Sequence, residues 1–200
     1  MAAGIKRAFD LSMSIAGLLV LSPILLLISL VVLVMDGRPV FFAQTRVGRR
    51  GRPFSLYKFR TMSLDHGGLL VTSGTDRRVT AIGRRLRRYK LDELPQLVNV
   101  LKGEMSFVGP RPEVPRFVDK FKDEYEIILT LKPGVTDRAS ILFKDESSLL
   151  KGGEADSEQE YIEKILPIKI RHNLDYVNNH GFFTDLGLIA RTLAAMVRPS

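Results

Sequence analysis

The sequence predicts an α+β, mostly helical protein in which a membrane segment precedes a compact cytoplasmic domain. Three observations support this fold class. Residues 11–35 form an uncharged apolar run, residues 39–62 alternate in the manner of a short β-hairpin, and several later segments repeat apolar residues at helical spacing. We therefore expect two units: a helix–break–helix in the membrane at residues 1–36, and a domain at residues 37–200 with amphipathic interfacial helices.

Composition excludes several kinds of site and favours an anionic partner. The chain of 200 residues has no cysteine, which excludes disulfides, thiolate zinc sites and a cysteine nucleophile. Its formal net charge of +8 is concentrated in one block: residues 38–90 carry 14 Lys and Arg and only two acidic residues, Asp65 and Asp76. Residues 91–200 carry 14 Lys and Arg against 18 Asp and Glu. Nucleic acid, a phosphate-rich metabolite or an acidic membrane surface would suit the basic block.

The apolar run is long enough to enter a membrane. Leu11–Met35 has 25 residues without a formal charge, which as a helix would measure about 37 Å against a hydrocarbon core of about 30 Å. The run is too long for the apolar region of a cleaved signal peptide. Ser22-Pro23 lies in its middle, and Pro23 removes an amide donor and clashes with the carbonyl group of Leu19. We expect a bend there, with the Ser22 hydroxyl bonding a carbonyl one turn back.

The charges around this segment bear on its topology. Lys6 and Arg7 precede it, and a larger group of arginines that begins at Arg38 follows it. Cytoplasmic flanks are enriched in Lys and Arg, so a bent helix that enters and leaves on the cytoplasmic side satisfies both flanks. Each arm, of about 18 Å, is too short to cross alone. Spanning helices with a proline kink are common, and the residues alone leave both topologies open.

The next segments read as a hairpin followed by short helices. Residues 39–62 predict two extended runs joined by a turn at 48–53, and residues 64–74 predict a loop. One helix is expected to begin near Thr80, and a second to cover Asp92 to Lys102.

Three further helices are expected in the C-terminal half. The first is amphipathic and covers about 113–131. The second opens at a capping box of Ser157 and Glu160, continues to about residue 180 and is bent by Pro167. The third covers 184–197 and is either core packing or an interfacial helix, the latter being slightly favoured.

The acidic pair Asp92-Glu93 is the strongest local signal for chemistry. Pro95 is comfortable only in the first turn of a helix, which places the pair at a positive helix end that follows an arginine cluster. Both influences favour the carboxylate form, so we expect Asp92 to be ionised near neutral pH. An ionised Asp can attack phosphorus, and a neighbouring Glu can hold Mg²⁺.

The same residues have plainer readings that remain open at this point. Asp92 can be an N-cap with Glu93 in the first helical turn, without any chemistry. The basic cluster can bind phosphate oxygens of a diphosphate substrate, form a solvated helix face, or contact anionic lipid headgroups.

Five motifs in order carry a resemblance to a known family. They are the Ser22-Pro23 break in an N-terminal apolar helix, Tyr57-Lys58-Phe59-Arg60-Thr61-Met62, Leu91-Asp92-Glu93-Leu94-Pro95-Gln96-Leu97, Met105-Ser106-Phe107-Val108-Gly109-Pro110-Arg111-Pro112, and Lys132-Pro133-Gly134-Val135-Thr136. With these motifs, from about Lys6 to Leu193, the chain closely resembles the bacterial sugar transferase family, and among it the small monotopic phosphoglycosyl transferases. The length resembles that of the minimal catalytic unit.

The resemblance implies a reaction in two steps. The Asp of the dyad, here Asp92, would attack the β-phosphorus of a nucleotide diphosphate sugar, usually a UDP-sugar, and release the nucleoside monophosphate. Polyprenyl phosphate would then take the sugar 1-phosphate from the enzyme, which initiates glycoconjugate assembly. Residues 37–200 would be the catalytic domain.

The resemblance also implies roles for single residues and a location. Glu93 would be the ligand of the cofactor Mg²⁺, and Lys58, Arg87, Arg111 and, more weakly, Arg78 would bind substrate phosphates. Residues 1–36 would be a re-entrant hairpin broken at Ser22 and Pro23, which makes the protein monotopic on the cytoplasmic face of the bacterial inner membrane. The implied partners are a UDP-sugar, an undecaprenyl-type phosphate and membrane lipid, and no nucleic acid.

One departure from the family pattern and two rival functions stay open. Many relatives continue the last motif with glycine and a Trp/Ala-Gln segment, where this chain has Asp137-Arg138-Ala139-Ser140-Ile141, so the sugar is left open. The glycan pathway, the polyprenol length and the oligomeric state are open as well. The rivals are a non-enzymatic, membrane-anchored cationic recruitment module and a one-step transferase in which Asp92 only binds metal.

Overall fold

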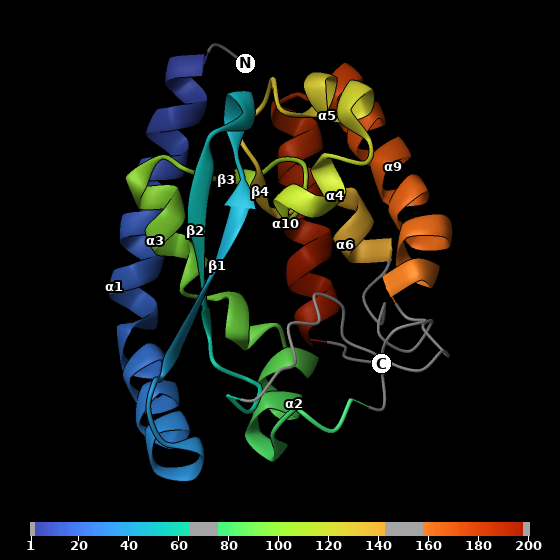
Figure 1. Cartoon of the computed structure of the whole chain (residues 1–200). Helices are drawn as coiled ribbons and strands as arrows, with labels where there is room; N and C mark the ends of the chain where they lie inside the picture. The colour runs from blue at the N-terminus through green and yellow to red at the C-terminus, as the bar shows by residue number, and fades with distance from the viewer. Residues whose placement is uncertain (1–2, 65–75, 143–157, 198–200) are drawn as a thin grey trace.

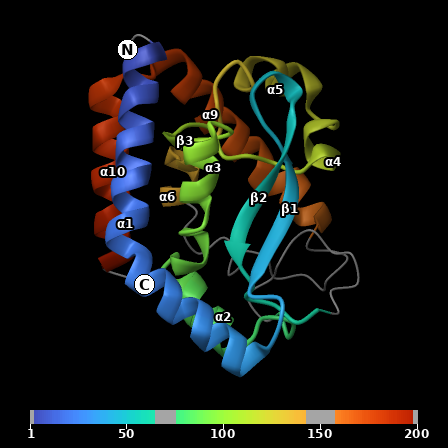
Figure 2. The same cartoon turned by 90° about the vertical axis from the view of Figure 1, so that its left-hand side faces the viewer.

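The long N-terminal helix is the most extended element of the protein. The computed structural model describes residues 3–64, 76–142 and 158–197, which leaves most of the expected loop 64–74 and Ser157 outside the described residues. Helix α1 (Ala3–Asp36) is continuous, contains Pro23, and bends about halfway along its length (Figure 2). The hydroxyl group of Ser22 donates a 2.8 Å hydrogen bond to the carbonyl oxygen of Leu19. The expected bend and its hydroxyl partner are therefore present, although the helix is not interrupted.

Most of α1 has no protein around it. The segment Gly4–Asp36 is long and apolar enough to cross a membrane, with a mean hydropathy of 3.0 and only 11% of its most apolar window buried. The outward-facing side chains are large and aliphatic, for example Leu19, Val20, Leu26 and Val34. In water these side chains would form an apolar patch far larger than soluble monomers expose, so α1 is suited to a lipid environment.

The first end of α1 is fixed to the domain by polar contacts. Lys6 forms an ion pair with Asp185, and the Asp10 carboxylate accepts hydrogen bonds from the hydroxyl group of Ser106 and the backbone amide of Phe107, both 3.0 Å long. The guanidinium group of Arg7 donates to carbonyl oxygens in the last turn of α3, which satisfies groups that have no partner within that helix.

The second end of α1 is fixed to the same domain. The buried Arg60 guanidinium donates to the carbonyl oxygens of Asp36, Gly37 and Arg38, the last at 3.0 Å. The Thr80 hydroxyl group donates a 2.8 Å hydrogen bond to the Asp36 carboxylate. Both ends of the apolar helix are thus held by one folded unit.

A β-hairpin follows α1, as the alternation of residues 39–62 predicts. Strands β1 (Phe41–Val47) and β2 (Pro53–Phe59) pair antiparallel from Phe41 opposite Phe59 to Val47 opposite Pro53, with the short helix η1 (Arg49–Gly51) in the turn. Phe59 is buried against Ile28 and Val32 of α1. The hairpin is thereby oriented by α1.

Three short helices lead from the hairpin to the acidic pair. Helix α2 (Ala81–Arg88) begins after the N-cap Thr80, as predicted. The expected helix from Asp92 is wrong at its start, because Leu91–Glu93 forms a separate 3₁₀ turn, η2, and α3 (Gln96–Lys102) begins only after Pro95. Its expected end at Gly103 is confirmed, with this glycine in the left-handed conformation.

A parallel strand pair lies in the middle of the domain and was not predicted. Strands β3 (Ser106–Val108) and β4 (Gly134–Thr136) pair with Ser106 opposite Gly134. A side chain on Gly134 would collide with the backbone of Gly109, so the two glycines permit the close approach of the chains.

The C-terminal half is helical and packs on this pair (Figure 1). The expected helix 113–131 is wrong: the chain forms α4 (Pro115–Val118) and α5 (Lys122–Ile128), because Phe121 adopts a non-helical backbone conformation. After α6 (Arg138–Leu142), the π-helical segment η3 (Tyr161–Ile165) gives way to α9 (Leu166–Asn179) next to Pro167. Helix α10 (Phe182–Val197) ends the described chain. Side chains of α4, α5, η3 and α9, among them Phe117, Tyr125 and Leu166, form the largest buried cluster.

Candidate active site

The hairpin and the 3₁₀ turn bring a lysine and the acidic pair together. Lys58 lies on β2, and its Nζ atom donates a 2.7 Å hydrogen bond to Oε1 of Glu93 on η2. Arg111 follows β3, and its Nη2 atom donates to the same oxygen at 3.0 Å. Three of the residues that the sequence analysis selected, from three separate elements, therefore meet at one carboxylate oxygen.

Asp92 differs from its neighbour because its carboxylate is not neutralised by hydrogen bonds. The residue is only 6% exposed, and its Oδ1 atom is buried without a hydrogen-bond partner in the described part of the chain. Burial raises the pKa of Asp92 above its ordinary value, although the charge of Lys58 acts in the opposite direction. We expected the surroundings of Asp92 to favour its carboxylate form. This expectation is wrong, because burial raises the pKa of Asp92 more than the neighbouring cations lower it. A buried acceptor without a partner is rare and costly in proteins, which indicates a functional role for this atom.

Glu93 has the opposite electrostatic character. Burial alone would raise the pKa of Glu93, but the charges of Lys58 and Arg111 hold that pKa well below its ordinary value. Burial in turn lowers the pKa of Lys58, while Glu93 opposes this change. Glu93 is therefore held in its carboxylate form and bonds two cations, whereas the pKa of Asp92 is shifted in the opposite direction.

Arg87 approaches the pair from α2. Its Nε atom donates a 2.8 Å hydrogen bond to the hydroxyl group of Thr61, and burial lowers the pKa of Arg87. The largest charge that acts on its guanidinium group is that of Asp92. Gly83 allows this position, since a side chain there would collide with the backbone of Thr61. Arg87 thus adds a third buried cation near the pair.

Arg78 lies at the edge of the site. It forms an ion pair of 2.5 Å with Asp76, and the hydrogen bonds from Arg78 lower the pKa of Asp76. Asp76 and Arg78 both act electrostatically on Arg87. The structure therefore connects Arg78 to the site through Arg87, with no bond to the acidic pair among the interactions of the described residues.

One contribution to the site was missed by the sequence analysis. The Ser140 hydroxyl group accepts a 3.1 Å hydrogen bond from Nη1 of Arg111 and donates to the Asp137 carboxylate. Asp137 and Ser140 have the spacing of an N-cap and its third helical residue, which can be recognised in a sequence. Nothing in the sequence connects Ser140 to Arg111. Lys90 belongs to the basic run that precedes the acidic pair in the sequence, and its charge acts on both Asp92 and Glu93.

The site offers carboxylate oxygens, which are among the ligands that Mg²⁺ prefers. Within residues 3–64, 76–142 and 158–197, no group of three or more His, Asp and Glu side chains could form a complete protein cage. Mg²⁺ does not need one, since it is commonly held by one or two carboxylates together with substrate phosphates and water. The carboxylate of Glu93, whose Oε2 atom takes no part in the bonds to Lys58 and Arg111, fits this kind of site.

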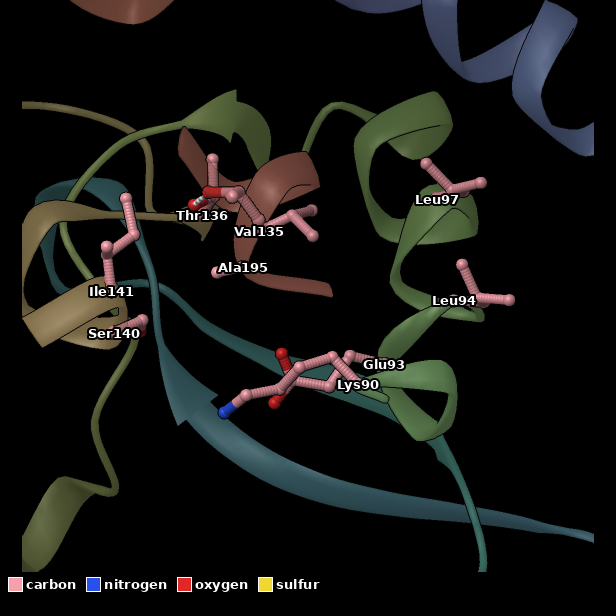
Figure 3. Close-up of a pocket in the computed structure, with 10 residues that line it drawn as sticks. Lys90, Glu93, Leu94, Leu97, Val135, Thr136, Ser140, Ile141 and Ala195 are labelled. Carbon is pink, nitrogen blue, oxygen red and sulfur yellow. Dashed lines mark hydrogen bonds between the residues drawn. The ribbon is translucent and has the colours of Figure 1, made fainter. Parts of the chain in front are cut away.

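An apolar cavity of about 110 Å³ adjoins the acidic pair (Figure 3). Glu93 and Lys90 lie next to each other at one end of it, and the remaining walls are almost entirely apolar. Leu94 and Leu97 line one side, and Ile141 of α6 lines the opposite side. The site therefore has a charged face and an apolar face.

Comparison with known proteins supports a common origin over nearly the whole chain. Residues 1–199 match the family described as bacterial sugar transferase. The chain is 34% identical over 199 residues, 96% of its length, to the UDP-N-acetylgalactosamine-undecaprenyl-phosphate N-acetylgalactosaminephosphotransferase of Aeromonas hydrophila. It is 46% identical over 145 residues, 68% of its length, to the undecaprenyl-phosphate glucose phosphotransferase of Komagataeibacter xylinus.

A third relative is closer in size. The chain is 38% identical over 191 residues, 94% of its length, to the uncharacterized sugar transferase EpsL of Bacillus subtilis (strain 168). The chain spans 85% of this protein, but only 44% of the Aeromonas protein and 27% of the Komagataeibacter protein. The similarity thus concerns a part that the larger relatives share with EpsL.

Proposed function

Because the chain belongs to the bacterial sugar transferase family, we propose that it transfers a sugar 1-phosphate from a UDP-sugar to a membrane polyprenyl phosphate. The product would be a polyprenyl diphosphate sugar, with which the assembly of a glycoconjugate begins. The Aeromonas relative is named for a UDP-sugar and for undecaprenyl phosphate, which supports both substrate classes.

In the first step, Asp92 is the nucleophile. A lone pair of its carboxylate attacks the β-phosphorus of the UDP-sugar, the bond from that phosphorus to the bridging oxygen breaks, and UMP leaves with the electron pair. The sugar phosphate remains on the enzyme as an aspartyl phosphodiester. The observation that carries this proposal is the Oδ1 atom of Asp92, which is buried without a hydrogen-bond partner beside cations. An acceptor with no competing donor is free to attack, provided that the carboxyl group is ionised.

The cations neutralise the phosphates during this step. Phosphoryl transfer depends mainly on position and charge stabilisation, and Lys58, Arg87 and Arg111 surround the acidic pair from three elements. Glu93 holds Lys58 and Arg111 through one oxygen, so these side chains are oriented before the substrate binds.

Glu93 would hold the Mg²⁺ that the family resemblance implies. When bound, the ion would supply positive charge to the diphosphate and its leaving group. Only Oε1 of Glu93 takes part in the bonds to Lys58 and Arg111, so Oε2 is oriented as a ligand by those same bonds.

In the second step, polyprenyl phosphate regenerates the enzyme. An oxygen of the lipid phosphate attacks the phosphorus of the aspartyl phosphodiester, and the bond from phosphorus to Asp92 breaks. Asp92 leaves as a carboxylate. The two substrates differ greatly in solubility, and an exchange through one covalent intermediate lets the same cations serve both in turn.

The position of α1 supports a monotopic arrangement on the cytoplasmic face of the inner membrane. Lys6 is bonded to α10, and Asp36 is bonded to Arg60 and Thr80, so both ends of the apolar helix return to one domain. A straight spanning helix would place its two ends on opposite sides of the bilayer, whereas here one domain contacts both ends. We therefore extend the proposal to a re-entrant helix bent near Ser22 and Pro23.

The experiment is a screen of UDP-sugars with the purified chain, Mg²⁺ and undecaprenyl phosphate, with release of UMP as the readout. The proposal predicts UMP release by the wild type, loss of release after Asp92→Asn, and loss on addition of EDTA. Asp119→Asn is the matched control, because this aspartate is exposed and distant in sequence from the pair. A cationic recruitment module would release no UMP from any donor. A one-step transferase would release UMP only when the lipid acceptor is present.

A further inference from the structure

The apolar cavity next to Glu93 has no role in the charge stabilisation described above. Its volume is about 110 Å³, and its walls are formed mainly by Leu94, Leu97, Val135, Ile141, Thr192 and Ala195. Three hydroxyl groups line it: those of Thr136 and Thr192 are hydrogen-bonded to each other, and that of Ser140 is bonded to Arg111 and Asp137. The cavity therefore suits an apolar group and offers few partners to a polar one.

The size of the cavity restricts the group. An engineered cavity of about 150 Å³ binds benzene, which has six carbon atoms. A cavity of about 110 Å³ is thus suited to a branched unit of about five carbon atoms. This corresponds to a single isoprene unit, whereas a whole polyprenyl chain would have to continue outside.

Lys90 supplies a charge at the mouth of the cavity. Its side chain forms no hydrogen bond or ion pair with the described residues and lies beside Glu93 in Figure 3. Its backbone has a φ of 56° and a ψ of 19°, the left-handed conformation, which costs roughly 1–2 kcal/mol for a residue other than glycine. Glycine is the usual residue at this place after a helix, so the lysine side chain is kept at an energetic cost. A cation held in this way, close to the acidic pair, is suited to an anionic group of a ligand.

The cavity is also close to the lipid-facing elements. Leu97, which lines it, lies against Gly17 of α1, where an added side chain would be 3.3 Å from the leucine. Helix α10 lines the cavity with Thr192 and Ala195 and exposes the large apolar side chain of Leu193. A lipid chain that leaves the cavity would therefore meet apolar surface.

We infer that this cavity is the acceptor subsite: it binds the first isoprene unit of the polyprenyl phosphate, and Lys90 binds the phosphate attached to that unit. The inference rests on the proposed function, from which it takes the chemical class of the acceptor. It adds a place for the lipid, in a cavity that Glu93 lines and Lys58 does not. The phosphate would thereby lie next to Asp92, where the second step needs it.

The uracil or sugar of the donor is the competing occupant. Both carry polar groups around their whole rim and need hydrogen-bond partners, which the apolar walls do not provide. The charged face with Lys58, Arg87 and Arg111 is the better site for the donor.

The test is a binding measurement that needs no donor. Radiolabelled farnesyl phosphate is equilibrated with the purified full chain in detergent micelles, with protein-free micelles as the blank. Ala195→Leu adds three carbon atoms to the cavity wall, and Ala194→Leu makes the same change at the neighbouring exposed position. We expect Ala195→Leu to weaken the binding of farnesyl phosphate at least about tenfold, and Ala194→Leu to leave it at the wild-type level. Equal binding by both variants overturns the inference, as does a loss of UMP binding in Ala195→Leu with farnesyl phosphate unaffected.

A second variant tests the role of Lys90. Lys90→Asn removes the charge and retains a side chain that tolerates the left-handed conformation. We expect about tenfold weaker binding of farnesyl phosphate and unchanged binding of farnesol, which lacks the phosphate. If both probes lose affinity equally, Lys90 acts on the structure and not on the phosphate.

A measurement on the wild type covers the case in which a variant does not fold. Farnesyl phosphate with a photoreactive diazirine on its first isoprene unit should label peptides of α6, α10 or residues 94–97. Label confined to α1 or to the hairpin contradicts the inference. These results are independent of turnover: a chain that releases no UMP can still bind farnesyl phosphate in the cavity, and a chain that releases UMP can bind it elsewhere.

Discussion

The Nζ atom of Lys58 lies 2.7 Å from Oε1 of Glu93, so the lysine is bonded to the second member of the acidic pair and not to the first. Arg111 shares that oxygen, and Oδ1 of Asp92 stays without a partner in the described chain. In the proposed function the two adjacent carboxylates have separate tasks: Glu93 fixes the cations, and Asp92 is left free to react. The predictions on Lys58 and on Asp92 depend on this division.

Replacing Lys58 should reduce the rate more than it reduces donor binding. Lys58→Met removes a cation that is oriented by Glu93, and the loss of one such group typically lowers kcat about 10²–10³-fold. The measurement is UMP release under single-turnover conditions, with the UDP-sugar that the screen identifies. Lys102→Met is the control, since Lys102 is exposed and is bonded to Tyr57. A Lys58 variant with an unchanged rate would remove this lysine from the site.

The pH range in which the first step is active should be narrowed at both its acidic and its alkaline end. Burial raises the pKa of Asp92 above 3.8, and Asp92 attacks only as a carboxylate, so activity should be lost on acidification at a higher pH than an ordinary aspartate predicts. Burial lowers the pKa of Lys58 below 10.5, so the alkaline loss should begin below that value. The profile of kcat/KM for UMP release tests both limbs. In Lys58→Arg the alkaline limb should move upward, because a guanidinium group does not lose its proton there.

Asp92→Asn should be more stable than the wild type at neutral and alkaline pH. The raised pKa means that the folded state holds more protons than the unfolded state between 3.8 and the folded pKa, so stability falls as pH rises through this window. Above it, the ionised and buried Asp92 destabilises the fold, and the amide removes that contribution. Thermal unfolding should give a higher Tm for Asp92→Asn, with a difference that disappears as the pH falls towards 3.8. A lower Tm at pH 8 would show that the cations stabilise this carboxylate more than burial destabilises it.

Labelling of single cysteines should place both ends of α1 on one side of the membrane. The chain contains no native cysteine, so Gly4→Cys and Thr45→Cys, both at exposed positions, report on the two ends without background. In inside-out vesicles a membrane-impermeant maleimide should modify both variants, and in right-side-out vesicles neither. Modification of Gly4→Cys only in right-side-out vesicles would establish a spanning helix instead.

The elements that the sequence predicts well are those with local signals. The hydroxyl group of Thr80 accepts a 2.9 Å hydrogen bond from the amide of Gly83, which is the cap that the sequence indicates for α2. The bond from Ser22 to the Leu19 carbonyl follows equally from residues one turn apart. Asp92 and Glu93 were indicated by Pro95 and the basic cluster as one of several open readings, whereas Lys58 was found only through the family motif.

The features that were missed depend on contacts between distant segments. The spacing of Phe117, Phe121, Tyr125 and Ile128 is the same for a continuous helix and for the interrupted one, so periodicity could not reveal the break at Phe121. The pairing of β3 with β4 depends on the close approach at Gly109 and Gly134, which are far apart in the sequence. The role of Ser140 becomes visible only when Arg111 lies beside it.

The burial of Asp92 could not be predicted from the sequence either, and it reverses the expected direction of the pKa shift of Asp92. A position among arginines predicts a lowered pKa, but the desolvation of a buried carboxylate acts in the opposite direction and is the larger effect here. Its size depends on how the hairpin and α2 cover the acidic pair.

Mass spectrometry of the enzyme during the first step tests the covalent role of Asp92 most directly. The chain is mixed with the active UDP-sugar and Mg²⁺, without lipid acceptor, then quenched and digested. The account predicts a mass increase of one sugar phosphate on the peptide that contains Asp92, its disappearance when undecaprenyl phosphate is added, and its absence in Asp92→Asn. An unmodified Asp92 in a preparation that turns over, together with full activity of Asp92→Asn, would contradict it.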